Sequence, residues 1–204
     1  MKISYIIAGG PFDGFFDKVG ENDLVITADK GYEYAKAENI KIDYAIGDFD
    51  STAKPDFDKL ITLNPIKDFT DTDAAIRLAI ERGYENITIY GGLGGREGHT
   101  VANIKTIFHY KNKDINIKLK SKNKEVFVIN EKFTYDYRGK DFYVSIFSLT
   151  ESSTLDIRGL YYELDNYEMK NDDSLGVSNQ TNKRDFEIDV KEGSLLVIFE
   201  DFSA

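Results

Sequence analysis

The stretch LVITADKGYEYAKAENIKIDYAIGDFD, residues 24–50, decides the fold of the N-terminal half. It starts with an apolar run at 24–28, continues through a helix-like segment at 32–38 and returns to apolar residues at 44–46. Two short apolar runs separated by a helix are typical of a βαβ unit, in which the two strands are parallel. This stretch therefore predicts a parallel sheet covered by helices.

The same alternation extends to about residue 120. Further strands are predicted at residues 3–8, 60–63, 87–90 and 115–119, and further helices at 73–82 and 100–110. In the first of these helices Ala75, Ile76, Ala79 and Ile80 share one face, as Val101, Ile104, Ile107 and Phe108 do in the second. The N-terminal half is thus an α/β fold with a mostly parallel sheet.

The helical period disappears after residue 124. Strand-like runs at 125–129, 133–137, 142–149, 155–158, 161–164, 186–190 and 195–199 are separated by polar turns. Such spacing indicates an all-β, antiparallel sandwich or barrel. We predict two domains, an α/β domain at 1–124 and a β-sandwich at 125–204.

Composition excludes several classes of protein. The formal net charge is −10 with a pI of about 4.8, and no basic patch is obvious, which argues against nucleic-acid binding. The chain has no cysteine, so disulfides and thiolate metal sites are excluded. The N-terminal apolar run is too short for a signal sequence or a membrane span. We expect a cytoplasmic protein that does not bind membranes.

Polar and glycine-rich residues follow the predicted parallel strands. Gly9-Gly10 follows the first strand, residues 28–31 the second, 47–51 the third and 91–99 the strand near residue 90. Ligands of open parallel sheets bind beyond the carboxyl ends of the strands. These segments therefore predict an active site at one edge of the sheet.

Two acidic clusters lie in these segments. Asp48 and Asp50 place two carboxylates on one tight loop, and oxygen ligands of this kind suit a hard cation such as Mg²⁺. In residues 68–73, Thr70 and Asp73 resemble a capping box that opens the next helix. We predict a metal-binding role for Asp71, whereas Asp73 is equally consistent with helix capping.

The glycine-rich segment 91–99 ends at a predicted helix start. Glycines let the backbone approach phosphates, and the N–H groups at a helix start attract anions. Arg96 supplies a cation for a phosphate. His99 is equally consistent with a cap or core histidine. In the C-terminal half, residues 176–180 read as a turn or a binding segment, and Tyr161 and Tyr162 as a stacking surface or core.

Taken in order, these motifs resemble the thiamine pyrophosphokinase family. The resemblance covers almost the whole chain and rests on the following segments: 28–31, Gly47-Asp48-Phe49-Asp50-Ser51, 68–73, 91–99 leading to Asn103, 159–164, 176–179 and 193–198. It implies an α/β nucleotide-binding domain, a β-sandwich that helps bind thiamine, and a homodimer whose thiamine site is shared between subunits. The implied reaction transfers the β,γ-diphosphate of ATP to the hydroxyl of thiamine, giving thiamine diphosphate and AMP.

The resemblance also implies roles for individual residues. Asp48, Asp50 and Asp71 are expected to hold Mg²⁺ and, with Arg96, to be catalytic. Asp71 is also the candidate base, and it is expected at the thiamine site together with Ser178 and Asn179. ATP is expected to contact Asp29, Asp48, Asp50, Thr70, Asp73, Gly94, Gly95, Arg96 and His99.

One position departs from the family pattern. Gly98 stands where the family commonly has Asp, with Glu97 beside it. This departure keeps one alternative open, a non-catalytic protein that binds thiamine or a nucleotide. A second alternative is a metal-dependent nucleotide-sugar transferase in which Asp48-Phe49-Asp50 holds a metal-bound diphosphate.

Overall fold

The computed structural model describes residues 2–49, 54–64 and 68–202. The chain divides into two compact units, Met1–Lys122 (unit 1) and Asn123–Ala204 (unit 2). The sequence places the boundary two residues later, between 124 and 125. No helix in the described ranges is both long and apolar enough to cross a membrane.

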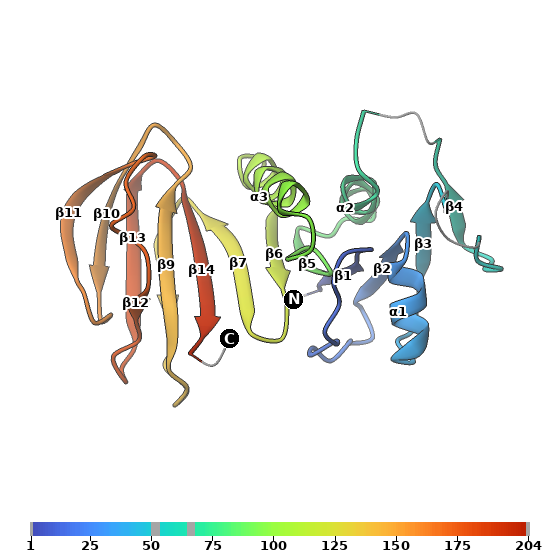
Figure 1. Ribbon diagram of the computed structural model, residues 1–204, viewed down its shortest axis with the longest axis horizontal. Helices are drawn as coiled ribbons and strands as arrows, with labels where there is room; N and C mark the ends of the chain where they lie inside the picture. The colour runs from blue at the N-terminus through green and yellow to red at the C-terminus, as the bar shows by residue number, and fades with distance from the viewer. Residues whose placement is uncertain (1, 50–53, 65–67, 203–204) are drawn as a thin grey trace. The chain divides into compact units, whose positions relative to one another are not determined.

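Unit 1 is built on a parallel sheet. Its strands are β1 (Ser4–Ile7), β2 (Leu24–Ala28), β3 (Tyr44–Gly47), β4 (Leu60–Thr62), β5 (Asn86–Tyr90) and β6 (Asn116–Lys120). They pair in the order β6-β5-β1-β2-β3-β4, and each of these pairs is parallel (Figure 1). From β1 the chain therefore adds β2, β3 and β4 in turn on one side of β1. It then crosses to the other side of β1, where it adds β5 and β6. The gap between the ends of β1 and β5 is the topological switch point at which such sheets bind ligands.

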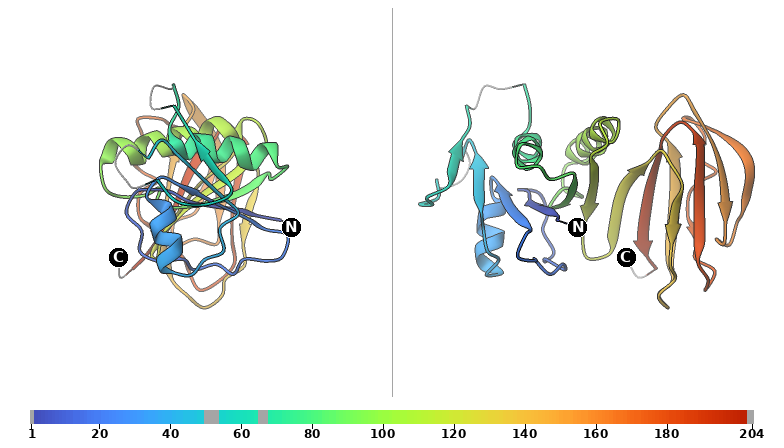
Figure 2. Two further views of the ribbon diagram at one scale, coloured as in Figure 1. Left: turned by 90° about the vertical axis from the view of Figure 1, so that its right-hand side faces the viewer. Right: turned by 180° about the vertical axis from the view of Figure 1, so that it is seen from behind.

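Helices cover both faces of this sheet. Figure 2 (left) shows α2 (Asp71–Glu81) and α3 (Glu97–Lys111) on one side of the parallel strands and α1 (Gly31–Ala37) on the other. Because both faces are covered, every residue of β1 and β2 is buried, which explains their unbroken apolar runs. The Thr70 hydroxyl accepts the Asp73 N–H at 3.1 Å, so the predicted helix cap is confirmed.

Unit 2 consists of two antiparallel sheets. One has the order β12-β9-β14-β7, formed by β7 (Lys124–Ile129), β9 (Phe142–Ser148), β12 (Asn179–Gln180) and β14 (Leu195–Asp201). The other has the order β11-β10-β13-β8, formed by β8 (Phe133–Tyr135), β10 (Ser152–Arg158), β11 (Leu164–Lys170) and β13 (Phe186–Glu192). Alternate residues of β9 and β10 are buried, and a core that includes Val144, Ile146 and Leu155 joins residues from both sheets. This is the sandwich predicted for residues 125–204.

Two predictions about elements are wrong. Residues 161–163 form a bend, and β11 begins only at Leu164, because Gly159 takes a φ of +88° and turns the chain out of the sheet after β10. On α3, Val101 does not join the buried face, since 52% of its surface is exposed. The first turn of that helix borders a cleft, where Ala102 also lies.

Candidate functional site

A cleft of about 880 Å³ opens at the carboxyl ends of β1, β2 and β5 in unit 1. Its walls come from the segments after those strands and from the first turns of α2 and α3. The lining residues are Ala8, Gly9, Gly10, Pro11, Asp29, Lys30, Glu33, Phe69, Thr70, Asp71, Thr72, Gly91, Gly92, Gly94, Arg96, His99, Ala102 and Asn103. The cleft therefore lies at the edge of the sheet that the sequence indicates, at the switch point between β1 and β5.

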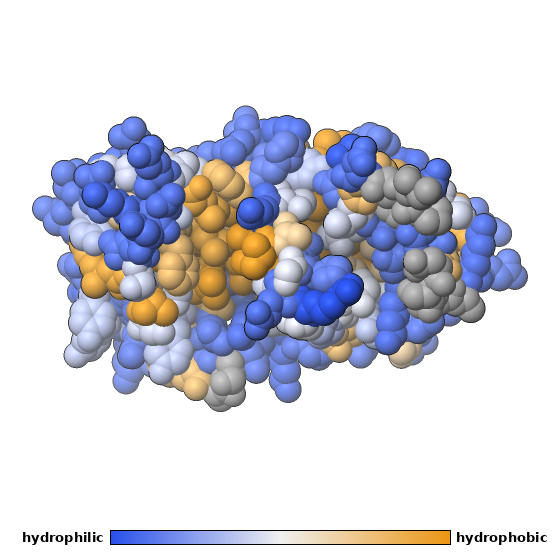
Figure 3. All heavy atoms as spheres, turned by 45° about the horizontal axis from the view of Figure 1, so that its top comes forward, coloured by the Kyte–Doolittle hydropathy of each residue, from blue (hydrophilic) through white to orange (hydrophobic). Residues whose placement is uncertain are grey.

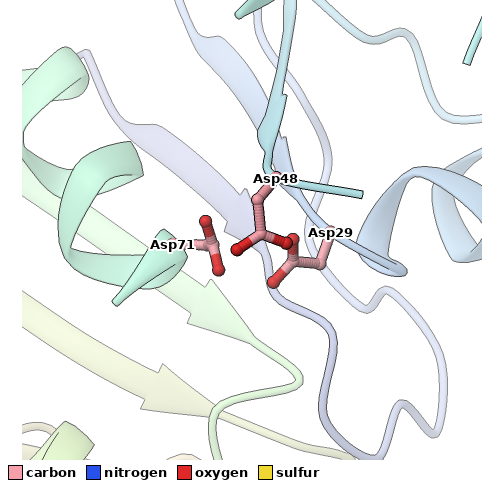
Figure 4. Close-up of side chains that lie close together, drawn as sticks. All are labelled: Asp29, Asp48 and Asp71. Atoms are coloured by element: carbon pink, nitrogen blue, oxygen red, sulfur yellow. The ribbon is translucent and has the colours of Figure 1, made fainter. Parts of the chain in front are cut away.

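Three carboxylates converge at this edge. Asp29 follows β2, Asp48 follows β3 and Asp71 is the first residue of α2, and in Figure 4 their side chains point toward one another. One ligand oxygen from each lies within 4.8 Å of the other two. All three side chains are partly buried. A set of oxygen donors at this spacing fits a hard divalent cation such as Mg²⁺ and offers none of the nitrogen or sulfur ligands that Zn²⁺ prefers.

The backbone around these carboxylates is held in unusual conformations. Asp29 and Phe49 have φ values of +50° and +52°, a region that costs free energy for residues other than glycine. The ring of Phe49 is buried, and the Asp29 N–H donates to the Ile46 carbonyl at 2.9 Å, so packing and a hydrogen bond hold both residues in place. A Cβ on Gly47 would lie 2.5 Å from the Asp29 carboxylate. Glycine at position 47 therefore leaves the space that this carboxylate occupies.

A glycine-rich loop forms the opposite wall. Gly91, Gly94 and Gly95 all have positive φ, and a Cβ on Gly91 would lie 2.5 Å from the Ala8 carbonyl oxygen. The Asn103 amide donates to the Gly92 carbonyl at 2.8 Å, which ties the loop to α3. The loop ends at the α3 N-terminus, a helix of 15 residues. Backbone N–H groups at such a position attract anions.

Charged side chains complete this wall. Arg96 is the N-cap residue of α3, His99 lies in its first turn, and both are exposed and line the cleft. The His99 N–H donates to the Arg96 carbonyl at 2.9 Å. An anion in the cleft thus meets one guanidinium, one imidazole and a helix start, opposite the three carboxylates.

Asp73 has a different environment from Asp71, although both lie in the first turn of α2. Its carboxylate accepts hydrogen bonds from the Tyr110 hydroxyl and from Arg77 Nε, each at 2.8 Å. Burial, followed by the bond to Asp73, raises the pKa of Tyr110 to about 12. Asp73 does not line the cleft, so the structure gives it a role in joining α2 to α3. Asp50, the remaining predicted metal ligand, lies outside the described residues.

In unit 2 the two predicted thiamine-site residues behave differently. Ser178 is exposed with a φ of +54°, and its N–H donates to the Ser145 hydroxyl at 3.0 Å. Asn179 is buried, and its amide group binds backbone on both sides. Its Nδ2 donates to the Tyr162 carbonyl at 2.8 Å, and its Oδ1 accepts the Tyr162 N–H at 3.0 Å and the Gln180 N–H at 2.8 Å.

The bonds to Asn179 fix the 161–163 bend and leave two aromatic rings exposed. Tyr161 and Tyr162 are 61% and 64% exposed and contact each other edge to face, with centroids 5.0 Å apart. Of the two interpretations that the sequence leaves open for these tyrosines, the structure excludes the core.

Sequence reasoning missed two features of the cleft. It places Asp29 among the ATP contacts but not among the candidate metal ligands, which the structure brings together with Asp29. It also gives Glu33 no role, although this residue lines the cleft. The position of Asp29 directly after β2 was a usable signal, because Asp48 follows the neighbouring strand β3 at the same edge of the sheet. No signal in the sequence marks Glu33, which lies on a predicted helix.

Comparisons with known proteins match this arrangement over both units. A family model described as "Thiamin pyrophosphokinase, catalytic domain" matches residues 16–119, and one described as "Thiamin pyrophosphokinase, vitamin B1 binding domain" matches residues 130–195. The thiamine pyrophosphokinase of Bacillus subtilis (strain 168) is 29% identical over 192 residues, which cover 88% of this chain and 90% of that protein.

Two crystal structures agree with this result. They are those of the thiamine pyrophosphokinase from Bacillus subtilis and of the thiamin pyrophosphokinase from Geobacillus thermodenitrificans. Each has a TM-score of 0.85 and 25% identity to this chain. The alignments cover 98% and 99% of this chain, respectively, and 99% of each solved chain.

Proposed function

Because this chain belongs to the thiamine pyrophosphokinase family, we propose that it binds ATP in the unit 1 cleft and transfers the β,γ-diphosphate to thiamine. The observation that carries the proposal is the convergence of Asp29, Asp48 and Asp71 opposite a glycine-rich helix start. This arrangement presents cation ligands and anion-binding N–H groups to the same space. A nucleoside triphosphate with its divalent cation requires both.

Mg²⁺ is the proposed cofactor. Asp29, Asp48 and Asp71 would hold it, and the sequence adds Asp50, which lies outside the described residues. When bound, the ion would neutralise charge on the phosphate chain and orient it. Such an ion also reduces the repulsion between a triphosphate and a protein with a net charge of −10.

The chain's own residues then have distinct proposed tasks. Arg96 and the glycine loop bind phosphate oxygens, and His99, Gly94 and Gly95 line the same path. The hydroxyl oxygen of thiamine forms a bond to the β-phosphorus, the bond from that phosphorus to the α,β-bridging oxygen breaks, and AMP leaves. The hydroxyl proton passes to a base, for which Asp71 is the candidate. Positioning and charge neutralisation supply most of the catalysis in such loose transition states.

Unit 2 is the proposed thiamine-binding unit. The exposed rings of Tyr161 and Tyr162 offer a stacking surface, and aromatic faces attract cations such as the thiazolium ring of thiamine. Ser178 directly precedes Asn179, whose side chain is hydrogen-bonded to the backbone of this bend. The acidic character of the protein favours a cationic substrate over anionic competitors.

A homodimer is a further part of the proposal. Leu175 and Val177, shortly before Asn179, are 62% and 57% exposed. Tyr161 and Tyr162 are exposed on the bend that Asn179 binds, so large apolar side chains are exposed on both segments. Figure 3 shows apolar atoms gathered left of the centre of one face. Exposed apolar groups of this kind mark surfaces that bind a ligand or a partner. Sedimentation equilibrium of the purified protein tests the homodimer, and a monomer at micromolar concentration would exclude it.

The cytoplasmic location stays a prediction.

The direct test incubates the purified protein with Mg²⁺, ATP and thiamine and separates the products by chromatography. We expect AMP and thiamine diphosphate in equal amounts. ADP with thiamine monophosphate would indicate transfer of a single phosphoryl group and contradict the proposal. Tight thiamine binding without AMP would favour the non-catalytic alternative, and binding of a sugar nucleotide instead of ATP would favour the transferase alternative.

A further inference from the structure

Three side chains form a hydrogen-bonded network that includes Tyr90, the residue before the cleft-lining Gly91. The Tyr90 hydroxyl donates to Asp17 Oδ2 at 2.6 Å, and Lys120 Nζ lies 2.7 Å from Asp17 Oδ1. Tyr90 is the last residue of β5 and is completely buried, whereas Lys120 is the last residue of β6. Burial, followed by the bond to Asp17, raises the pKa of Tyr90, so its hydroxyl stays a donor. None of the three side chains lines the cleft or belongs to its acidic cluster.

Asp17 belongs to a segment that lacks regular secondary structure, residues 11–19 (the 11–19 segment). Side chains rather than a backbone ladder hold it to the sheet. The Phe16 N–H donates to the Tyr90 hydroxyl at 3.3 Å, and the Phe15 and Tyr90 rings have centroids 4.8 Å apart. At the same end of the sheet, the Lys122 N–H donates to Asp13 Oδ2 at 3.0 Å. The segment is therefore tied to Tyr90 and to the end of β6, in addition to the stacking of the Phe12 ring on Tyr34, with centroids 5.1 Å apart.

The start of this segment packs against the glycine loop that faces the cleft. A Cβ on Gly95 would lie 3.1 Å from Pro11 Cδ, and one on Gly94 would lie 3.7 Å from Pro11 Cγ. A Cβ on Gly10 would lie 2.4 Å from the Gly91 carbonyl oxygen. The start of the 11–19 segment and the 91–96 loop therefore pack so closely that a side chain at Gly10 or Gly95 would crowd its neighbours. Gly91, in turn, directly follows Tyr90. A shift of the 11–19 segment would move the surface against which Gly94 and Gly95 pack.

We propose that Asp17, Tyr90 and Lys120 are positioning residues, which fix the 11–19 segment and the 91–96 loop in the geometry that binds the phosphate chain. This inference rests on the proposed function for the identity of the ligand, ATP. It adds that the affinity for ATP depends on three side chains that do not touch it. One charge-assisted network holds both loops, because its members come from β5, β6 and the segment between β1 and β2.

The first test compares Tyr90→Phe with the wild type. This substitution removes one oxygen atom and keeps the ring that packs on Phe15. We expect KM for ATP to rise about tenfold, the factor that one hydrogen bond to a charged group is worth. KM for thiamine and kcat should stay within about twofold, since the reacting groups are untouched. The matched control is Tyr84→Phe, which removes an exposed hydroxyl that donates to the Asn22 carbonyl at 2.9 Å in the same unit.

Hydrogen exchange supplies a readout that does not depend on activity. In Tyr90→Phe, amides of residues 9–19 and 91–96 should exchange faster, while those of β2 and β3 keep their wild-type rates. Uniformly faster exchange would indicate a loss of global stability and overturn the positioning role. Unchanged exchange together with an unchanged KM for ATP would overturn it as well.

Asp17→Asn is the second variant, in case the phenylalanine protein does not fold. It keeps the shape of the side chain and an oxygen acceptor but removes the charge that pairs with Lys120. The same two loops should exchange faster, and ATP with Mg²⁺ should bind more weakly in calorimetry. If the wild type does not bind ATP at all, the proposed function fails, and the exchange measurement still decides whether the network positions the loops.

Discussion

In unit 1 the carboxylates of Asp29, Asp48 and Asp71 converge at one edge of the cleft, whereas in unit 2 the amide of Asn179 is buried and binds the backbone of Tyr162. Both sets lie in short polar segments between strands. The first gathers its side chains at the proposed metal site, and the second uses its side chain to shape a bend that presents two tyrosines. A motif residue can therefore act by contact or by holding the backbone, and the two modes have different experimental signatures.

The largest effect is expected from the residues that act by contact. Asp48→Ala and Asp71→Ala should each lower kcat by about a thousandfold, because each removes an oxygen ligand from the proposed metal site. Calorimetry should show weaker Mg²⁺ binding. The free energy of unfolding in urea should equal or exceed that of the wild type, because the repulsion among the three carboxylates is reduced. The control is Asp114→Asn, at an exposed position with a φ of +60° that asparagine tolerates. Near-wild-type turnover in either alanine variant would remove that residue from the metal site.

Asn179→Ala should show the opposite signature, a loss of stability. It removes three hydrogen bonds from a buried side chain, and we expect the free energy of unfolding to fall by about 2–3 kcal/mol. KM for thiamine should rise, because the bend that presents Tyr161 and Tyr162 loosens. The measurement is urea unfolding combined with steady-state kinetics.

Ser178→Gly is the matched variant for Asn179→Ala. Glycine accepts the positive φ at this position, and the bond from its N–H to the Ser145 hydroxyl can persist. We expect a free energy of unfolding within about 0.5 kcal/mol of the wild-type value. If Asn179→Ala proved as stable as Ser178→Gly while thiamine binding was lost, Asn179 would act by contact after all.

These two modes also explain what the sequence could and could not predict. The parallel sheet follows from the alternation of strands and helices, and the position of the cleft follows from the strand-end residues, since every parallel strand delivers its carboxyl end to the same edge. The side-chain direction of Asn179 does not follow from its neighbours in sequence, because its partner Tyr162 is 17 residues away. The role of Asp73 was equally hidden, since its partner Tyr110 lies 37 residues further along the chain.

A smaller effect is expected where Asp73 joins α2 to α3. Tyr110→Phe removes the hydroxyl that donates to Asp73 and should lower the free energy of unfolding at neutral pH by about 1 kcal/mol, with kcat little changed. If Asp73 instead contacted ATP, the loss of this bond would change KM for ATP.

The same bond predicts a dependence on alkaline pH. The pKa of Tyr110 is raised to about 12, while an unfolded chain loses this proton near pH 10. Between these values the unfolded state binds fewer protons than the native state, so stability that is present below about pH 10 is lost as the pH rises toward 12. The wild type should therefore lose stability over this window faster than Tyr110→Phe. Parallel curves for the two proteins would contradict the assignment.

The smallest effect concerns Gly98, the position where the chain departs from its family. It lies in the first turn of α3 without a positive φ, and a Cβ there would meet no atom within 4 Å. Gly98→Ala should thus stabilise the protein by about 0.5 kcal/mol, because alanine lowers the conformational entropy of the unfolded chain. The control is Gly10→Ala, which should destabilise the protein because its Cβ would lie 2.4 Å from the Gly91 carbonyl oxygen.

Gly98→Asp should stabilise the protein by a similar amount, since a carboxylate at a helix start is favourable. Because Asp29, Asp48 and Asp71 already supply three ligand oxygens, we expect kcat of Gly98→Asp to stay within about threefold of the wild type, a difference of under 1 kcal/mol in the barrier. A larger rise would mean that the acidic cluster acts with a fourth carboxylate in the family, and that this chain works without it at the expense of rate.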